Sequence, residues 1–125
     1  MNPIALEMTE KAFQAEIMAA LKACGYMVYH THDSRRSAAG FPDLMCVRPG
    51  ECFFAELKSE RGRVSVEQQE WIDALREAGQ VVHVWKPSDR PIIEKLLALK
   101  APLGRERPPD RVGYLEAREL MRRNQ

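Results

Sequence analysis

A short hairpin in the middle of the chain constrains the fold more than any other segment. Two strand-like runs, residues 44–47 and 51–58, are separated by the turn residues Arg48-Pro49-Gly50-Glu51. Proline and glycine in a connection of this length are typical of a tight turn between antiparallel strands. The spacing therefore predicts that the two runs pair as neighbouring strands of one sheet.

Charged residues stand at the open end of this predicted hairpin. Gly40-Phe41-Pro42 predicts a turn that delivers Asp43 to the start of the first strand, because proline restricts its own φ and the residue before it. Side chains alternate along a strand, so Glu56 and Lys58 share a face, and Asp43 meets Glu56 across the ladder. Taken alone, Glu56 and Lys58 are equally well explained as a surface ion pair. With Asp43 they suggest a site for Mg²⁺ or Mn²⁺, which prefer oxygen ligands.

Capping residues and hydrophobic periodicity predict the remaining elements. Thr9 is placed to cap a first helix that ends before Gly25, and Ser65 a second helix that ends before Gly79. The predicted order is helix 10–24, strand 26–31, strands 44–47 and 51–58, helix 66–78, strand 81–85 and helix 87–99. This order predicts an α/β fold with a mixed central sheet flanked by helices. We expect one domain over residues 1–100, a linker over 101–111 and a C-terminal helical tail over 112–125.

Both of the first two predicted helices carry polar residues on an apolar side. At about 100° per residue, Glu10 and Gln14 fall within the apolar stripe of the first helix, whereas Glu16 lies outside it. Glu10 is our choice for a carboxylate near the site, although an acid in a first turn also favours the helix dipole. Gln68 shares the apolar face of the second helix, so it either points toward the sheet or satisfies a local hydrogen bond at the helix start.

The overall charge gives no argument for nucleic-acid binding. The 125 residues carry a net charge of only +1, so any DNA contact has to come from local clusters. The candidates for such contacts, otherwise ordinary surface arginines, are Arg35, Arg36, Arg61 and Arg63.

Cysteine spacing and hydropathy point to the cytoplasm. Cys24, Cys46 and Cys52 show no CxxC spacing and sit in apolar segments, which favours buried reduced thiols over disulfides or a zinc site. No signal peptide is recognisable, and no apolar run approaches the ~18 residues of a membrane span. We therefore expect a protein without membrane contact, in a bacterial cell or a phage-infected host.

The ordered motifs resemble the PD-(D/E)XK nuclease superfamily, and specifically the small stand-alone VRR-NUC domains that are frequent in phage genomes. The resemblance covers roughly residues 8–90. Its five pieces are residues 9–14, residues 28–37, Gly-Phe-Pro-Asp at 40–43, Glu-Leu-Lys at 56–58 and residues 62–68. It implies a restriction-endonuclease-like core that hydrolyses DNA phosphodiester bonds and leaves a 5′-phosphate and a 3′-hydroxyl.

The same resemblance implies a role for each candidate residue. The implied catalytic set is Glu10, Asp43, Glu56, Lys58 and Gln68. Asp43, Glu56 and the backbone carbonyl of Leu57 are expected to bind Mg²⁺ or Mn²⁺, with Glu10 reaching the metal directly, through water or through a second metal. Apart from the resemblance, the place of His30 at a strand end is equally consistent with a phosphate contact and with an ordinary polar surface histidine, and the four arginines named above are the candidates for gripping flanking phosphates. No organic cofactor is expected.

A rival metal motif is weak. His30-Thr31-His32-Asp33 superficially resembles the start of a binuclear metallohydrolase site. No histidine follows Asp33, and His83 is the only other histidine in the chain, so the ligand set for a hydrolytic zinc site is incomplete.

Among functions, the resemblance favours a Holliday-junction resolvase-like endonuclease acting on branched DNA. Two symmetric cuts across a junction require two active sites, so we expect a homodimer. A flap or nicking endonuclease and a restriction-type enzyme are the nuclease alternatives. A DNA-binding module with a silent nuclease fold is the non-enzymatic one.

Overall fold

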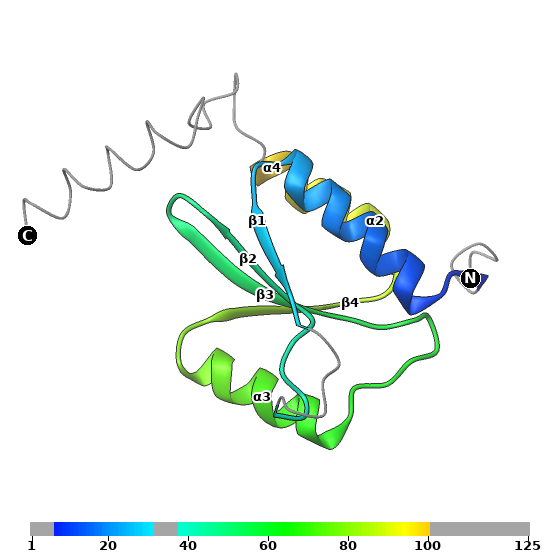
Figure 1. Cartoon of the computed structure of the whole chain (residues 1–125), viewed down its shortest axis with the longest axis vertical. Coiled ribbons are helices and arrows are strands. Elements are labelled where there is room, and N and C mark those ends of the chain that lie inside the picture. The colour runs from blue at the N-terminus through cyan, green and yellow to red at the C-terminus, as the bar shows by residue number, and fades with distance from the viewer. Residues whose placement is uncertain (1–6, 32–37, 101–125) are drawn as a thin grey trace, which may run out of the picture.

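The computed structural model describes residues 7–31 and 38–100, which form a four-stranded sheet with helices on both faces (Figure 1). The elements are α2 (Glu10–Ala23), β1 (Met27–His30), β2 (Leu44–Arg48), β3 (Glu51–Leu57), α3 (Val66–Glu77), β4 (Val81–Trp85), the 3-10 helix η1 (Pro87–Asp89) and α4 (Arg90–Lys100). This order confirms the predicted α/β fold with a restriction-endonuclease-like core. The predicted linker 101–111 and tail 112–125 lie outside the described residues.

The capping predictions are confirmed at both helix starts. The Thr9 hydroxyl accepts a hydrogen bond from the Ala12 amide at 3.0 Å, and the Ser65 hydroxyl accepts one from the Gln68 amide at 3.1 Å. Each bond satisfies one of the amides that a first helical turn leaves without an internal partner. The last helix starts later than predicted, because residues 87–89 form the 3-10 turn η1 and the α-helix begins at Arg90.

The sheet is mixed, with strand order β1-β2-β3-β4. β2 is antiparallel to both β1 and β3, whereas β3 and β4 run parallel on either side of the α3 crossover. The hairpin register pairs Leu44 with Ala55, so Asp43 stands one step beyond, level with Glu56. The sequence therefore predicted both the hairpin and its register correctly.

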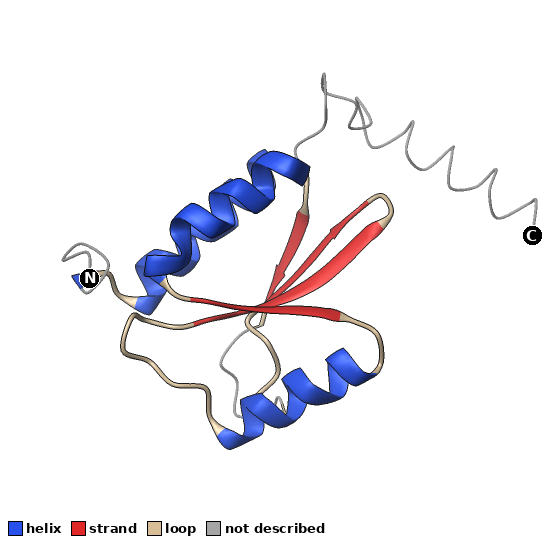
Figure 2. Cartoon of the chain, turned by 180° about the vertical axis from the view of Figure 1, so that it is seen from behind, coloured by secondary structure: helices blue, strands red, loops and turns tan. Residues whose placement is uncertain are grey.

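Alternation along β3 divides the core into two clusters, one on each face of the sheet (Figure 2). Phe53, Ala55 and Leu57 face α2 and α4, which contribute Phe13, Ile17, Leu21, Ile93 and Leu97 to the larger cluster. Phe54 faces α3 and packs with Ile72 and Val82 in the smaller cluster. Because side chains alternate, Glu56 lies on the α3 side with Phe54.

The expectation of buried thiols is only partly correct. Cys46 is buried in the larger cluster and Cys24 is half-buried, but Cys52 is exposed. Cys52 sits beside the hairpin turn, where β3 leaves the helix-covered part of the sheet, and apolar neighbours in the sequence do not reveal that position. All three thiols are free. Among the described residues, no helix has the length and apolar character needed to span a bilayer.

Candidate active site

The loop before β2 is fixed onto the start of α3. Gly40 has φ +94°, and a Cβ there would lie 2.5 Å from the backbone carbonyl group of Glu67. The Phe41 ring packs edge-on against Phe54 and Trp71, with centroid distances of 5.8 and 5.0 Å. The glycine and the aromatic contacts explain why the turn predicted at residues 40–42 holds a defined position.

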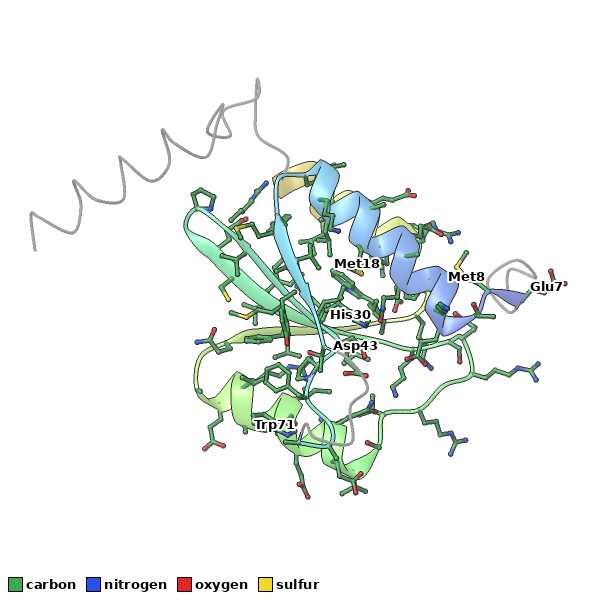
Figure 3. All side chains as sticks on the ribbon, in the orientation of Figure 1. Glu7, Met8, Met18, His30, Asp43 and Trp71 are labelled. Carbon is green, nitrogen blue, oxygen red and sulfur yellow. The ribbon has the colours of Figure 1, made fainter. Side chains whose placement is uncertain are left out.

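Asp43 is held across the end of the hairpin ladder (Figure 3). Its Oδ2 accepts a hydrogen bond from the Leu57 amide at 2.8 Å. Its backbone carbonyl accepts another from the Thr31 amide at 2.8 Å, and the Thr31 hydroxyl donates to the Pro42 carbonyl at 2.8 Å. The carboxylate is thus positioned by β3 and by the residue that follows β1.

Glu56 is a buried carboxyl in which one oxygen has a hydrogen-bond partner and the other has none among the described residues. Only 1% of the residue is exposed. Oε1 accepts a hydrogen bond from Gln68 Nε2 at 2.9 Å and lies 3.8 Å from Lys58 Nζ. Oε2 has no hydrogen-bond partner among the described residues. Because a buried acceptor without a partner is costly, this oxygen marks a place where a ligand is expected.

The environment of Glu56 favours its protonated form when no cation is bound. Burial raises the pKa of Glu56 from 4.5 to about 8, and the negative charge of Asp43 acts in the same direction. The positive charge of Lys58 lowers the pKa but does not outweigh these effects. The carboxyl pair therefore holds a proton near neutral pH, which a divalent cation could replace.

Glu10 stands at the edge of this carboxyl pair. It begins α2 as an exposed residue, yet partial burial of its carboxyl and the charge of Asp43 raise its pKa, while Lys58 lowers it. The interactions with Asp43 and Lys58 place Glu10 on the side of α2 that borders the pair. No three His, Cys, Asp or Glu side chains within residues 7–31 and 38–100 are grouped closely enough to form a metal site by themselves.

Gln68 combines the two roles between which the sequence did not decide. Its Oε1 accepts a hydrogen bond from the Ser65 amide at 2.8 Å, which completes a capping box at the start of α3. Its Nε2 donates to Glu56 Oε1 at the same time. One amide group therefore caps the helix and orients a buried carboxyl.

His30, at the end of β1, contacts a residue to which sequence reasoning gave no role. Gln14 Nε2 lies 2.8 Å from His30 Nε2. Gln14 is one turn beyond Glu10 on α2, and its place in the apolar stripe was the available signal. Glu16, off the stripe, is exposed at the surface, where its carboxylate binds the Arg90 guanidinium at 2.6 and 2.8 Å.

The predicted DNA-contacting arginines fall into two groups. Arg61 and Arg63 are exposed in the loop between β3 and α3. In the same loop Glu60 accepts a hydrogen bond from the Ser88 amide at 2.9 Å, and hydrogen bonding by the Ser88 side chain and then by its amide lowers the pKa of Glu60. Arg35 and Arg36 lie outside the described residues, as do His32 and Asp33 of the rival zinc motif.

The fold, together with Asp43, Glu56 and Lys58 at the ends of β2 and β3, defines a nuclease of the PD-(D/E)XK type. Residues 3–89 match the VRR-NUC domain, which belongs to that superfamily. Because the match spans more than half of the 125 residues, the chain belongs to the VRR-NUC family. No curated protein and no solved structure matches the chain.

Proposed function

We propose that the protein is a metal-dependent, structure-selective DNA endonuclease that cuts branched DNA as a homodimer, in the manner of a Holliday-junction resolvase. The observation that carries the proposal is the unpartnered Oε2 of buried Glu56, beside Asp43 and within reach of Lys58. A buried carboxyl oxygen without a hydrogen-bond partner is costly for a purely structural purpose. The arrangement argues against the alternative of a silent DNA-binding module.

Asp43 and Glu56 would hold a divalent cation together with the Leu57 backbone carbonyl. Carboxylate and carbonyl oxygens are the ligands preferred by Mg²⁺ and Mn²⁺. When bound, such a cation lowers the pKa of a coordinated water and offsets negative charge on the reacting phosphate. Glu10, whose carboxyl interacts with that of Asp43, would contact this site through water.

Lys58 and Gln68 would prepare the site for the attacking water. Lys58 is nearly buried, with 9% of the residue exposed, so its ammonium is held close to the carboxyl pair. It would orient the water and offset the charge that develops on the phosphate. Gln68 would keep Glu56 Oε1 in place, which leaves Oε2 as the oxygen directed to the cation.

Contacts to the flanking DNA would come from His30 and the arginines. Arg61 and Arg63 are exposed in the loop that connects Lys58 to α3, where they can reach phosphates next to the cut. Arg35 and Arg36, which precede Asp43 in the sequence, would add further phosphate contacts. Phosphate contacts of this kind position DNA without reading its sequence, in keeping with a structure-selective enzyme.

Cleavage of labelled four-way junctions, flaps and linear duplexes tests the chemistry. We expect cutting with Mg²⁺ or Mn²⁺, none with chelator, and a loss of about 100-fold or more in Asp43→Ala, Glu56→Gln and Lys58→Ala. Glu94→Gln, an exposed carboxyl on α4, is the matched control and should retain full activity. Undiminished metal-dependent cleavage by any of the three site variants contradicts the assignment.

The same substrates separate the nuclease alternatives. Paired, symmetric cuts across a four-way junction support the resolvase-like function. Single cuts confined to flaps or nicks would instead indicate a flap or nicking endonuclease, and cuts at one duplex sequence a restriction-type enzyme.

A further inference from the structure

The connection between β3 and α3, residues 58–65, is fixed at both of its ends. The Lys58 amide donates to the Trp85 carbonyl at 2.9 Å, so Lys58 continues the ladder between β3 and β4. At the other end Val64 packs on the smaller core cluster, just before the start of α3. Residues 59–63 lie between these two fixed ends, and we call them the arginine segment.

Glu60 joins the middle of the arginine segment to η1. The Gly62 amide donates to the Ser59 carbonyl at 2.9 Å, which closes a β-turn. Glu60 and Arg61 occupy the two central positions of this turn. Only 8% of Glu60 is exposed, and its Oε1 accepts a hydrogen bond from the Ser88 amide at 2.9 Å. The turn fixes the shape of the segment, and the bond to Ser88 fixes its position on the protein.

The charges of the arginine segment are divided between anchoring and solvent. Arg61 and Arg63 are exposed, whereas the carboxylate of Glu60 is used inside the protein. Hydrogen bonding by Ser88, and then the positive charge of Lys86, lowers the pKa of Glu60. Because the acceptor is ionised at neutral pH, its bond to the amide is a charge-assisted one. The segment therefore presents two cations to solvent and uses its only anion to hold itself in place.

We infer that Glu60 is a positioning residue for DNA binding, which holds Arg61 and Arg63 where they contact phosphates beside the cut. The inference rests on the proposed nuclease function, which supplies the DNA. Ordering a loop on binding costs affinity, and a segment that is anchored beforehand avoids much of this cost. Lys58 keeps its backbone bond to β4 and its place beside Glu56 without the anchor, so the chemical step should not depend on Glu60.

Binding of a labelled four-way junction to the full chain, measured by fluorescence anisotropy with chelator present, tests the inference. Glu60→Ala, and Glu60→Asp, whose side chain is too short to reach Ser88, should each raise the Kd for the junction about tenfold. If Glu60→Ala does not fold, Glu60→Asp carries the same prediction. Glu60→Gln keeps the acceptor and removes a charge that repels phosphate, so it should bind at least as tightly as wild type. Glu94→Gln on α4 is the matched control and should leave the Kd unchanged.

Cleavage kinetics with Mg²⁺ separate positioning from catalysis. Glu60→Ala and Glu60→Asp should raise KM for the junction and leave kcat within about twofold of wild type. If Glu60 were only a surface charge, its removal would have the opposite sign, and both Glu60→Ala and Glu60→Gln would bind DNA more tightly than wild type.

Two further readouts exclude a general loss of structure. In an Arg61→Ala, Arg63→Ala background, Glu60→Ala should change the Kd little, because the side chains through which it acts are absent. Trypsin digestion without DNA, followed by peptide mapping, should cut after Arg61 about fivefold faster in Glu60→Ala than in wild type, because the released segment opens more readily.

The inference is overturned by an unchanged Kd in Glu60→Ala and Glu60→Asp, or by a rise in Glu60→Gln equal to that in Glu60→Ala. A full further rise in the background without the two arginines, or an unchanged rate of cutting after Arg61, also overturns it, as does a wild type that does not bind DNA. A wild type that binds the junction but does not cut it with metal instead refutes the nuclease chemistry, and the comparison of Kd values remains valid.

Discussion

Replacing Glu56 by glutamine should stabilise the metal-free protein at alkaline pH while abolishing cleavage. In the folded protein the pKa of Glu56 is raised from 4.5 to about 8, mainly by burial and then by Asp43. The folded state therefore binds more protons than the unfolded state between these values. The stabilisation from the protonated carboxyl is present in full below about pH 4.5 and is lost as the pH rises to about 8.

The size of this effect follows from the displacement of the pKa. Each pKa unit corresponds to about 1.4 kcal/mol, so the displacement from 4.5 to about 8 sets an upper limit of about 5 kcal/mol on the stability lost over this range. Glutamine cannot ionise, can accept the bond from Gln68 through its oxygen, and can donate to Asp43. The free energy of unfolding of Glu56→Gln, relative to wild type, should therefore rise by a few kcal/mol between about pH 5 and pH 8.5.

Urea denaturation in the presence of a chelator measures this difference. Contributions from other titratable groups cancel when the two proteins are compared at each pH. Glu94→Gln on the outer face of α4 should show no such pH-dependent difference from wild type. Parallel stability profiles for wild type and Glu56→Gln over the whole range would refute the reasoning. Adding Mg²⁺ near pH 8 should stabilise wild type and not the variant, because only the wild-type carboxylate can bind the cation.

Three further perturbations test individual contacts. Gly40→Ala should lower the free energy of unfolding by about 1–3 kcal/mol, because its Cβ would meet the Glu67 backbone. Gly50→Ala, also at positive φ but in open space, should lower it less. Equal urea midpoints for the two variants would contradict this. Ser65→Ala should lower the free energy of unfolding by about 1 kcal/mol through the lost cap and leave most cleavage activity. Gln68→Ala should lower both stability and cleavage. Unimpaired cleavage by Gln68→Ala would rule out its orienting role. In the native protein a thiol reagent should label the exposed Cys52 quickly. Cys46 should react only on unfolding, because burial raises its pKa to about 12. Cys52→Ser is the control, and rapid labelling of Cys46 in that variant would show that the core opens.

Local signals in the sequence predicted two helix starts and the placement of Asp43 level with Glu56. Thr9 and Ser65 located two helix starts because capping depends on residues within one turn. The hairpin fixed the position of Asp43 relative to Glu56 because a tight turn sets the register of its own strands.

Other contacts could not be predicted because they join distant parts of the chain. Gln14 meets His30, and Glu60 meets the Ser88 amide, only after helices and loops have packed against the sheet. The exposure of Cys52 likewise depends on how far the helices extend over the end of β3. Periodicity identified Gln14 as unusual but contained no information about its partner.

The shared use of Gln68 links the local unfolding of α3 to the state of the carboxyl pair. If the first turn of α3 frays, the amide that caps it also leaves Glu56 Oε1, and a second buried oxygen loses its partner. Fraying at this helix end is therefore opposed by the desolvation of Glu56 as well as by the cap itself. Amide hydrogen exchange at the start of α3 should consequently respond to a cation bound more than ten residues earlier in the chain.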